Sequence, residues 1–235
     1  MSIAENLRQV QKKIAAAAEA SGRRPEDILL VGATKMNDTG RIQEAIAAGL
    51  RYCGENRVQE LLEKLPQGAY EGASLQFIGH LQKNKAKQIV GKVSLIQSVD
   101  SQELMALIDR LALERGIVQD ILLEVNVAGE AAKSGFRPEE VSAAIEAAAQ
   151  YKGIFVRGLM AVPPICSDGK ENIPYFLLMK QLFIDNGAKK YDNTSMGLLS
   201  MGMSGDYETA IACGANMVRI GSAIFGQRIY PARQN

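Results

Sequence analysis

The chain has 235 residues, a length that fits one large domain or two small ones. Lys and Arg number 27 and Asp and Glu 26, so the net charge is +1. This balance argues against nucleic acid as a partner, because binding a phosphate backbone needs a basic surface. Hydrophobic residues make up 47% and charged residues 23%, a globular composition that excludes a disordered chain. No apolar run reaches the roughly 18 residues that span a bilayer, so we expect no membrane association.

Cysteine and histidine usage narrows the class further. Cys53, Cys166 and Cys213 are far apart and form no CxxC pair, and His80 is the single histidine. This pattern argues against a disulfide scaffold and against a zinc site. The N-terminal segment carries charges throughout, which is not typical of a signal peptide. We therefore expect a cytoplasmic protein.

Strands and helices are predicted to alternate along the chain. The first helix carries Leu7, Val10 and Ile14 on one face and ends at Ser21-Gly22. The apolar run 28–33 follows, and its continuous apolarity indicates a strand that is buried on both faces. Further strands are predicted near 51–54, 75–79, 93–99, 120–127, 154–160, 196–201 and 217–220. The helices between them are predicted near 39–48, 58–62, 85–90, 101–111, 138–148, 172–185 and 207–213.

The repeated unit defines the fold. Eight strands, each followed by a helix or finally by a short tail, occupy 235 residues, about 29 residues per unit. Right-handed crossovers would close eight such units into a barrel. We therefore predict an α/β protein with one (β/α)8 TIM barrel domain over residues 1–235 and an extra N-terminal helix. A doubly wound open sheet is the alternative, but it usually has fewer strands and a crevice at a switch point.

In such a barrel the functional residues lie at the carboxyl ends of the strands. Lys35 ends the first strand, where burial would lower the pKa of its amine and suit it to Schiff-base chemistry. The alternative is a strand-end lysine that reaches solvent. The loops 199–205 and 220–222, after the seventh and eighth strands, carry Gly and Ser. They predict a phosphate site, the alternative being that small residues make tight turns.

Four further residues at the same edge each have two interpretations. Arg219 lies in an apolar strand, so it either meets a carboxylate such as Glu124 or faces a ligand. His80 is either a base or ligand, or a structural group with satisfied hydrogen bonds. Asn56 and Asn126 either hold a ligand or cap loops.

Several motifs together resemble the pyridoxal phosphate homeostasis protein family, whose barrel is related to the alanine racemase N-terminal domain. The motifs follow one another over nearly the whole chain: Ala33-Thr34-Lys35, Gly54-Glu55-Asn56-Arg57-Val58-Gln59-Glu60, Phe77-Ile78-Gly79-His80-Leu81-Gln82, Lys133-Ser134-Gly135, Arg157-Gly158-Leu159-Met160, Leu199-Ser200-Met201-Gly202-Met203-Ser204 and Val218-Arg219-Ile220-Gly221-Ser222. The resemblance implies the fold called type III among pyridoxal 5′-phosphate (PLP) proteins. It also implies that PLP is the cofactor, held as a Schiff base on Lys35.

The resemblance implies roles for the other site residues as well. It assigns the phosphate to Ser200, Gly221 and Ser222, the pyridine nitrogen to Arg219, and the surroundings of the ring to Asn56 and Met201. Arginine stays protonated and cannot accept a proton from the ring nitrogen. It therefore weakens the electron sink on which most PLP chemistry depends.

The function implied is maintenance of intracellular PLP (vitamin B6) homeostasis by a monomer that delivers PLP to apo-enzymes, without established catalytic turnover. The chain ends about fifteen residues after the eighth strand, so we expect it to lack the further domain that gives racemases a second base. One alternative is a PLP-dependent enzyme such as a weak amino-acid racemase. Another is a phosphate-binding barrel enzyme in which Lys35 works without PLP.

The sequence departs from the family pattern beside Lys35. Family members often carry a second lysine two residues later, usually before a proline, where this chain has Lys35-Met36-Asn37-Asp38. Lys133 is then the candidate for a role in PLP transfer. The alternative interpretation is that Lys133 is an exposed lysine of a loop. Gly205 follows Ser204 where the family commonly has an acidic residue.

Overall fold

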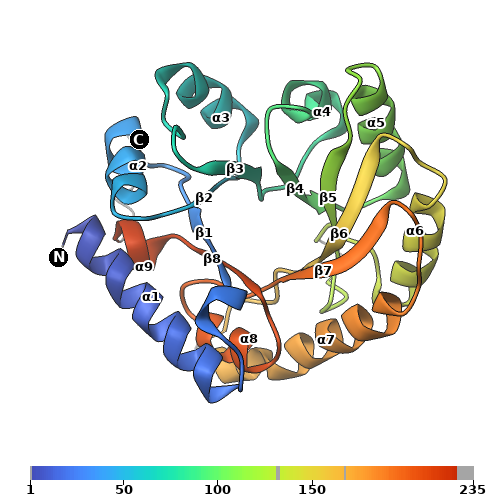
Figure 1. Cartoon of the computed structure of the whole chain (residues 1–235). Helices are drawn as coiled ribbons and strands as arrows, with labels where there is room; N and C mark the ends of the chain where they lie inside the picture. Colours follow the sequence, from blue (N-terminus) through green and yellow to red (C-terminus); the bar gives the residue numbers. More distant parts are fainter. Residues whose placement is uncertain (1, 131–132, 167, 227–235) are drawn as a thin grey trace, which may run out of the picture.

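The computed structural model describes residues 2–130, 133–166 and 168–226. Its parallel strands form a closed barrel in which each strand pairs with the next and β8 pairs with β1 (Figure 1). The strands are β1 (Leu29–Ala33), β2 (Tyr52–Glu55), β3 (Ser74–Phe77), β4 (Leu95–Val99), β5 (Gln119–Glu124), β6 (Ile154–Met160), β7 (Thr194–Ser200) and β8 (Met217–Ile220). The predicted (β/α)8 barrel is confirmed, and the open-sheet alternative is wrong.

Helices surround the barrel (Figure 1). They are α1 (Ile3–Ala20), α2 (Thr39–Ala47), α3 (Val58–Lys64), α4 (Lys83–Ile89), α5 (Gln102–Leu113), α6 (Val141–Ala148), α7 (Ile173–Gly187), α8 (Tyr207–Ala212) and α9 (Ser222–Phe225). Short 3₁₀ turns lie at η1 (Pro25–Asp27), η2 (Leu65–Gln67), η3 (Pro138–Glu140) and η4 (Gly169–Asn172). A short helix, α9, follows β8 where a tail was expected, and residues 227–235 lie outside the described residues.

The extra N-terminal helix α1 covers the sector of the barrel where the outer helices are shortest. It begins with a capping box, in which the Ser2 hydroxyl accepts from the Glu5 amide and the Glu5 carboxylate accepts from the Ser2 amide. Leu7, Val10 and Ile14 are buried, as the helical spacing predicted. The helix packs against α8 and α9, which span only 6 and 4 residues (Figure 1). It therefore supplies apolar cover that these two short helices lack.

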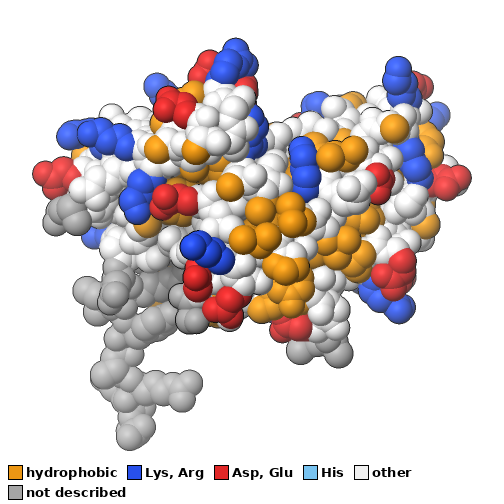
Figure 2. Space-filling model, turned by 90° about the horizontal axis from the view of Figure 1, so that it is seen from below, with side chains coloured by type: hydrophobic (Ala, Val, Ile, Leu, Met, Phe, Trp, Pro, Cys, Tyr) orange, Lys and Arg blue, Asp and Glu red, His pale blue; other side chains and the backbone are white. Residues whose placement is uncertain are grey.

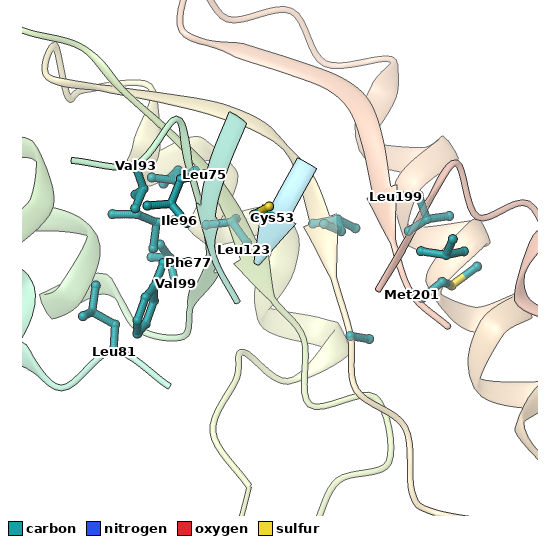
Figure 3. Close-up of a cluster of buried hydrophobic side chains, with 14 of the residues drawn as sticks. Cys53, Leu75, Phe77, Leu81, Val93, Ile96, Val99, Leu123, Leu199 and Met201 are labelled. Carbon is teal, nitrogen blue, oxygen red and sulfur yellow. The ribbon is translucent and has the colours of Figure 1, made fainter. Parts of the chain in front are cut away.

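Two apolar layers lie on the two sides of the barrel wall. The outer layer fills the space between strands and helices and includes Phe77, Leu123 and Leu199 (Figure 3). The inner layer is a smaller cluster within the barrel, formed by Val31, Leu95, Leu122, Met160 and Met217. Successive side chains of a strand point to opposite faces, so membership of a layer shows which residues point into the barrel.

No helix among the described residues is long and apolar enough to cross a membrane. Across residues 2–130, 133–166 and 168–226 there is also no group of three His, Cys, Asp or Glu side chains placed to hold a metal ion. The three cysteines are free thiols. Burial raises the pKa of Cys53 to about 12, so this thiol is inert at neutral pH.

Candidate functional site

The candidate site lies at the barrel mouth formed by the carboxyl ends of the strands. Tyr52, Leu122 and Met217 contribute to the inner layer. Counting by two along each strand then brings Asn56, Glu124 and Arg219 to the same side of the wall at the mouth. Lys35 follows the end of β1 by two residues and enters the mouth from the neighbouring strand. The backbone thus places three sequence-predicted residues, Lys35, Asn56 and Arg219, at one mouth together with Glu124.

The loop that carries Lys35 is fixed on both sides of the lysine. The Thr34 amide donates to the Gly54 carbonyl at 2.9 Å, which extends the pairing of β1 with β2. Met36 has φ +61°, the left-handed conformation that non-glycine residues rarely adopt. Its amide donates to Glu60 Oε2 at 2.8 Å. The chain therefore turns sharply directly after Lys35, and a carboxylate holds the turn.

A buried ionic cluster lies beside this loop. Lys64 Nζ is 2.8 Å from Glu55 Oε1 and 3.0 Å from Glu60 Oε2, and it donates to the Thr34 carbonyl at 3.2 Å. Glu55 Oε1 also accepts from the Thr34 hydroxyl at 2.8 Å and from the Tyr70 hydroxyl at 3.0 Å. Burial raises the pKa of Glu55, although Lys64 opposes the shift. Burial also works to raise the pKa of Glu60, but a backbone amide and Lys64 outweigh it and lower that pKa.

This cluster was not predicted from the sequence. The spacing of Glu60 and Lys64, four residues apart on α3, is the one local signal of an ion pair. Such pairs are usually exposed, whereas the Lys64 side chain is only 10% exposed and Glu55 is fully buried. The third member comes from β2, so only the packing of α3 on the barrel reveals the cluster.

Arg219 is buried inside the barrel at the end of β8. Its Nη1 donates to the Ser200 hydroxyl at 2.5 Å and its Nη2 to the Ala161 carbonyl at 2.9 Å. Ser200 in turn donates to Gln97 Oε1 at 2.7 Å, so its hydroxyl is engaged within the barrel. Burial lowers the pKa of Arg219 to about 10, an effect that the charge of Glu124 opposes. The guanidinium therefore stays charged at neutral pH, and its two hydrogen bonds go to neutral oxygen atoms.

The loops after β7 and β8 bring several hydrogen-bonding groups to one place. The Ser204 hydroxyl accepts from the amides of Gly221 and Ala223 at 3.3 and 3.4 Å. Ser222 is exposed and begins α9. Gly202 has φ +92°, which allows the loop after β7 to turn towards β8. Amides and hydroxyls gathered in this way suit an anion, and phosphate binding at these loops stays a prediction. The sequence reasoning named Gly221 and Ser222 for this role but not Ser204.

Met201 and Asn56 lie on different sides of the barrel wall. Met201 is fully buried in the outer layer beside Leu199 (Figure 3), so its side chain does not face the mouth. Asn56 faces the mouth, and its Oδ1 is buried without a hydrogen-bond partner. A buried acceptor without a donor costs about 1–3 kcal/mol, so such an atom is a mark of a ligand site.

A cavity of about 530 Å³ opens beside the mouth near the ends of β3 and β4. His80 Nδ1 lies 3.1 Å from Asp100 Oδ2 and 3.1 Å from the Ser134 hydroxyl, on the rim of this cavity. These contacts fit the interpretation of His80 as a structural group.

Burial raises the pKa of Glu124 to about 7, and the charge of Asp100 adds to the shift. Glu124 is therefore a carboxyl group that changes its charge near neutral pH.

Asn126 and Lys133 belong to the loop after β5. Asn126 Nδ2 donates to the carbonyls of Glu130 and Lys133 at 2.8 and 3.1 Å, so this side chain caps the loop rather than entering the mouth. Lys133 Nζ lies 2.7 Å from Glu130 Oε1, and its side chain is 36% exposed. A transfer role for Lys133 stays a prediction.

Comparison with known proteins places this chain in a family. The family model described as "Alanine racemase, N-terminal domain" matches residues 2–229. A pyridoxal phosphate homeostasis protein from Aquifex aeolicus is 40% identical over 230 residues, which cover 98% of this chain and 100% of that protein. The chain belongs to the pyridoxal phosphate homeostasis protein family. The resemblance inferred from the motifs is thereby confirmed.

Solved structures extend the comparison. PipY of Synechococcus elongatus, solved with PLP bound, is 30% identical to this homeostasis-family chain with a TM-score of 0.79, covering 96% of this chain and 100% of PipY. An alanine racemase from Clostridium difficile is 17% identical with a TM-score of 0.71, covering 97% of this chain and 58% of the racemase. The racemase shares the barrel fold, and at this identity the likeness extends no further.

Proposed function

We propose that this homeostasis-family protein binds PLP as a Schiff base on Lys35 and keeps the intracellular PLP level under control. The observation that carries the proposal is the meeting of Lys35, Arg219 and the anion-binding loops at one barrel mouth. PLP needs an amine for its aldehyde, a donor set for its phosphate and a partner for its ring nitrogen. The relative PipY, solved with PLP bound, supports PLP as the ligand.

Each described group has a part in holding the cofactor. The Lys35 amine would condense with the aldehyde and release one water molecule, a step that water reverses. The amides of Gly221 and Ala223 and the hydroxyls of Ser204 and Ser222 would bind the phosphate. The hydrogen bonds from the two amides to Ser204 are long, 3.3 and 3.4 Å, so an oxyanion would compete well for these amides.

Arg219 supports binding without catalytic turnover. The ring nitrogen of PLP draws electrons most strongly when it is protonated, and this supplies the cofactor's usual chemistry. Arg219 stays charged, with a pKa of about 10, and can only donate to that nitrogen. Ser200 would act through Arg219, because its hydroxyl accepts a hydrogen bond from the guanidinium. The unpaired Oδ1 of Asn56 is a further contact that the ring substituents could satisfy.

Trapping of the imine tests the proposal. PLP added to the purified protein should give an imine absorbance band, and borohydride should then fix PLP on Lys35, as peptide mass spectrometry would show. Lys35→Ala should lose the adduct, whereas Lys12→Ala, at an exposed position on α1, should keep it. An adduct of undiminished yield in Lys35→Ala would refute the assignment.

A weak PLP-dependent enzyme, for example an amino-acid racemase, is the second candidate. It is favoured by Glu124, whose pKa of about 7 lets it gain and lose a proton at neutral pH beside the mouth. Repeated turnovers of a D- or L-amino acid that disappear in Lys35→Ala and in Glu124→Gln would establish this activity. Their absence at high protein concentration would leave PLP homeostasis as the function.

We also propose that the protein acts as a monomer in the cytoplasm and passes PLP to apo-enzymes. Analytical ultracentrifugation of the loaded protein tests the first point. Delivery is tested by mixing an apo-enzyme with the PLP-loaded protein. Direct transfer predicts that the apo-enzyme recovers activity faster than the rate at which the loaded protein releases PLP into buffer.

A further inference from the structure

We propose that the buried cluster of Glu55, Glu60 and Lys64 positions Lys35 and sets the rates at which PLP is captured and released there. This inference rests on the proposed Schiff base at Lys35. The three side chains act through the backbone on either side of the lysine, so they are positioning residues.

The contacts of the cluster end on the two neighbours of Lys35. On one side, Thr34 donates its hydroxyl to Glu55 at 2.8 Å and accepts from Lys64 at its carbonyl at 3.2 Å. On the other side, the Met36 amide donates to Glu60 at 2.8 Å. Lys64 joins the two carboxylates, so the clamps on both sides of Lys35 form one connected unit.

The conformation of Met36 shows why a clamp is needed. Its φ of +61° is unfavourable for a residue with a side chain, and such strain persists only where surrounding contacts impose it. The Met36 side chain is 44% exposed and cannot supply much packing of its own. The Asn37 amide donates to the Thr34 carbonyl at 3.1 Å across the turn, and Glu60 supplies the hydrogen bond to the amide of the strained residue itself. Without the Glu60 bond we expect this turn to be less rigid, so that Lys35 is held less closely.

The burial of the cluster argues against a purely stabilising role. Glu55 is fully buried, the Lys64 side chain is 10% exposed, and Glu55 Oε2 has no hydrogen-bond partner. Removing such charges from water is costly, and apolar side chains of similar volume often stabilise a core equally well or better. The ionic groups do provide directed hydrogen bonds to the Lys35 loop, which apolar groups could not form.

Three variants of Glu60 separate position from charge. Glu60→Gln keeps an oxygen that can reach the Met36 amide but removes the charge. Glu60→Asp keeps the charge beside Lys64 but withdraws the carboxylate from that amide by one carbon. Glu60→Ala removes both. Glu63→Ala is the matched control, because Glu63 is exposed on the same helix.

The measurement is the rate of imine formation after PLP is mixed with each full-length protein, together with the rate of PLP release from the loaded form. We expect capture about tenfold slower and release faster in Glu60→Ala and Glu60→Asp, since a lost hydrogen bond to a charged group corresponds to roughly that factor. Glu60→Gln and Glu63→Ala should stay close to the wild-type rates. Equal melting temperatures of the PLP-free Glu60→Asp and wild-type proteins would show that the fold is unchanged.

Two results would overturn the inference. If Glu60→Asp matches the wild type while Glu60→Gln is slow, charge rather than position matters. If all three Glu60 variants capture PLP at the wild-type rate, the cluster has no influence on Lys35. A trapped adduct on Lys35 would in that case still support the proposed function. A wild-type protein that forms no adduct at all would overturn both proposals.

Discussion

Replacing Lys64 with methionine tests the energetics of the buried cluster. Lys64→Met removes the ammonium that lies 2.8 Å from Glu55 and 3.0 Å from Glu60 and keeps an apolar side chain of similar length. Glu55, which is fully buried, then loses its ionic partner, so its charged form is strongly disfavoured. Breaking a buried pair in this way costs about 3–5 kcal/mol of the free energy of unfolding. In a chain of this size each kcal/mol lowers the melting temperature by about 2–4 °C, so we expect a fall of roughly 6–20 °C.

The dependence on pH identifies the cause of this loss. Without Lys64, burial would raise the pKa of Glu55 further above its unfolded value of about 4.3. The folded variant then holds a proton that the unfolded chain has released, so its stability falls as pH rises from that value through the folded pKa. The deficit relative to the wild type should therefore be small at acidic pH and grow towards neutral pH. Combining Lys64→Met with Glu55→Gln should recover most of it, because the fully buried carboxylate is then replaced by a neutral amide.

Thermal unfolding of the PLP-free proteins at a series of pH values is the assay. Lys12→Met is the control, because Lys12 is exposed on α1 and its loss should change stability by no more than about 0.5 kcal/mol. The reasoning is refuted if Lys64→Met is as stable as Lys12→Met, or if its deficit is the same at every pH.

Three further changes probe the mouth and the barrel interior. In Gly79→Ala the new Cβ would lie 2.2 Å from the backbone oxygen of Asn56, so we expect about tenfold weaker PLP binding by titration. Gly187→Ala, at the end of α7 with the nearest atom 3.6 Å from the new Cβ, should bind normally. Equal affinities of the two variants would contradict the placement of Asn56. Ser200→Ala removes a hydroxyl engaged inside the barrel and should cost about 1–3 kcal/mol in denaturant unfolding, a loss that a surface serine would not show. Burial raises the pKa of Glu124 from 4.5 to about 7, so between these pH values the folded protein carries a proton that the unfolded chain has released, and wild-type stability should fall as pH rises from 4.5 to 7. Glu124→Gln should flatten this dependence of stability on pH. An unchanged dependence would refute the assignment of the shift to Glu124.

Much of the fold could be predicted because its signals are local. Apolar runs of strand length alternate with amphipathic helices, and eight repeats of this unit favour the closed barrel that the structure shows. The same rule places Lys35 and Arg219 at the mouth, since each stands at the carboxyl end of a strand. The extra helix α1 was equally visible from the spacing of its apolar residues.

The sequence by itself thus determined the family, the barrel and the strand ends at which Lys35 and Arg219 lie. Only the tertiary structure decided which way neighbouring side chains point and which partners they meet. Ser200 and Met201 are adjacent in one motif, yet Ser200 faces the barrel interior and Met201 the outer layer. Their direction depends on the strand's pairing register, which a motif does not specify. Lys64 likewise meets Glu55 and the Lys35 loop only after α3 packs on the barrel, because such contacts join residues that the chain holds far apart.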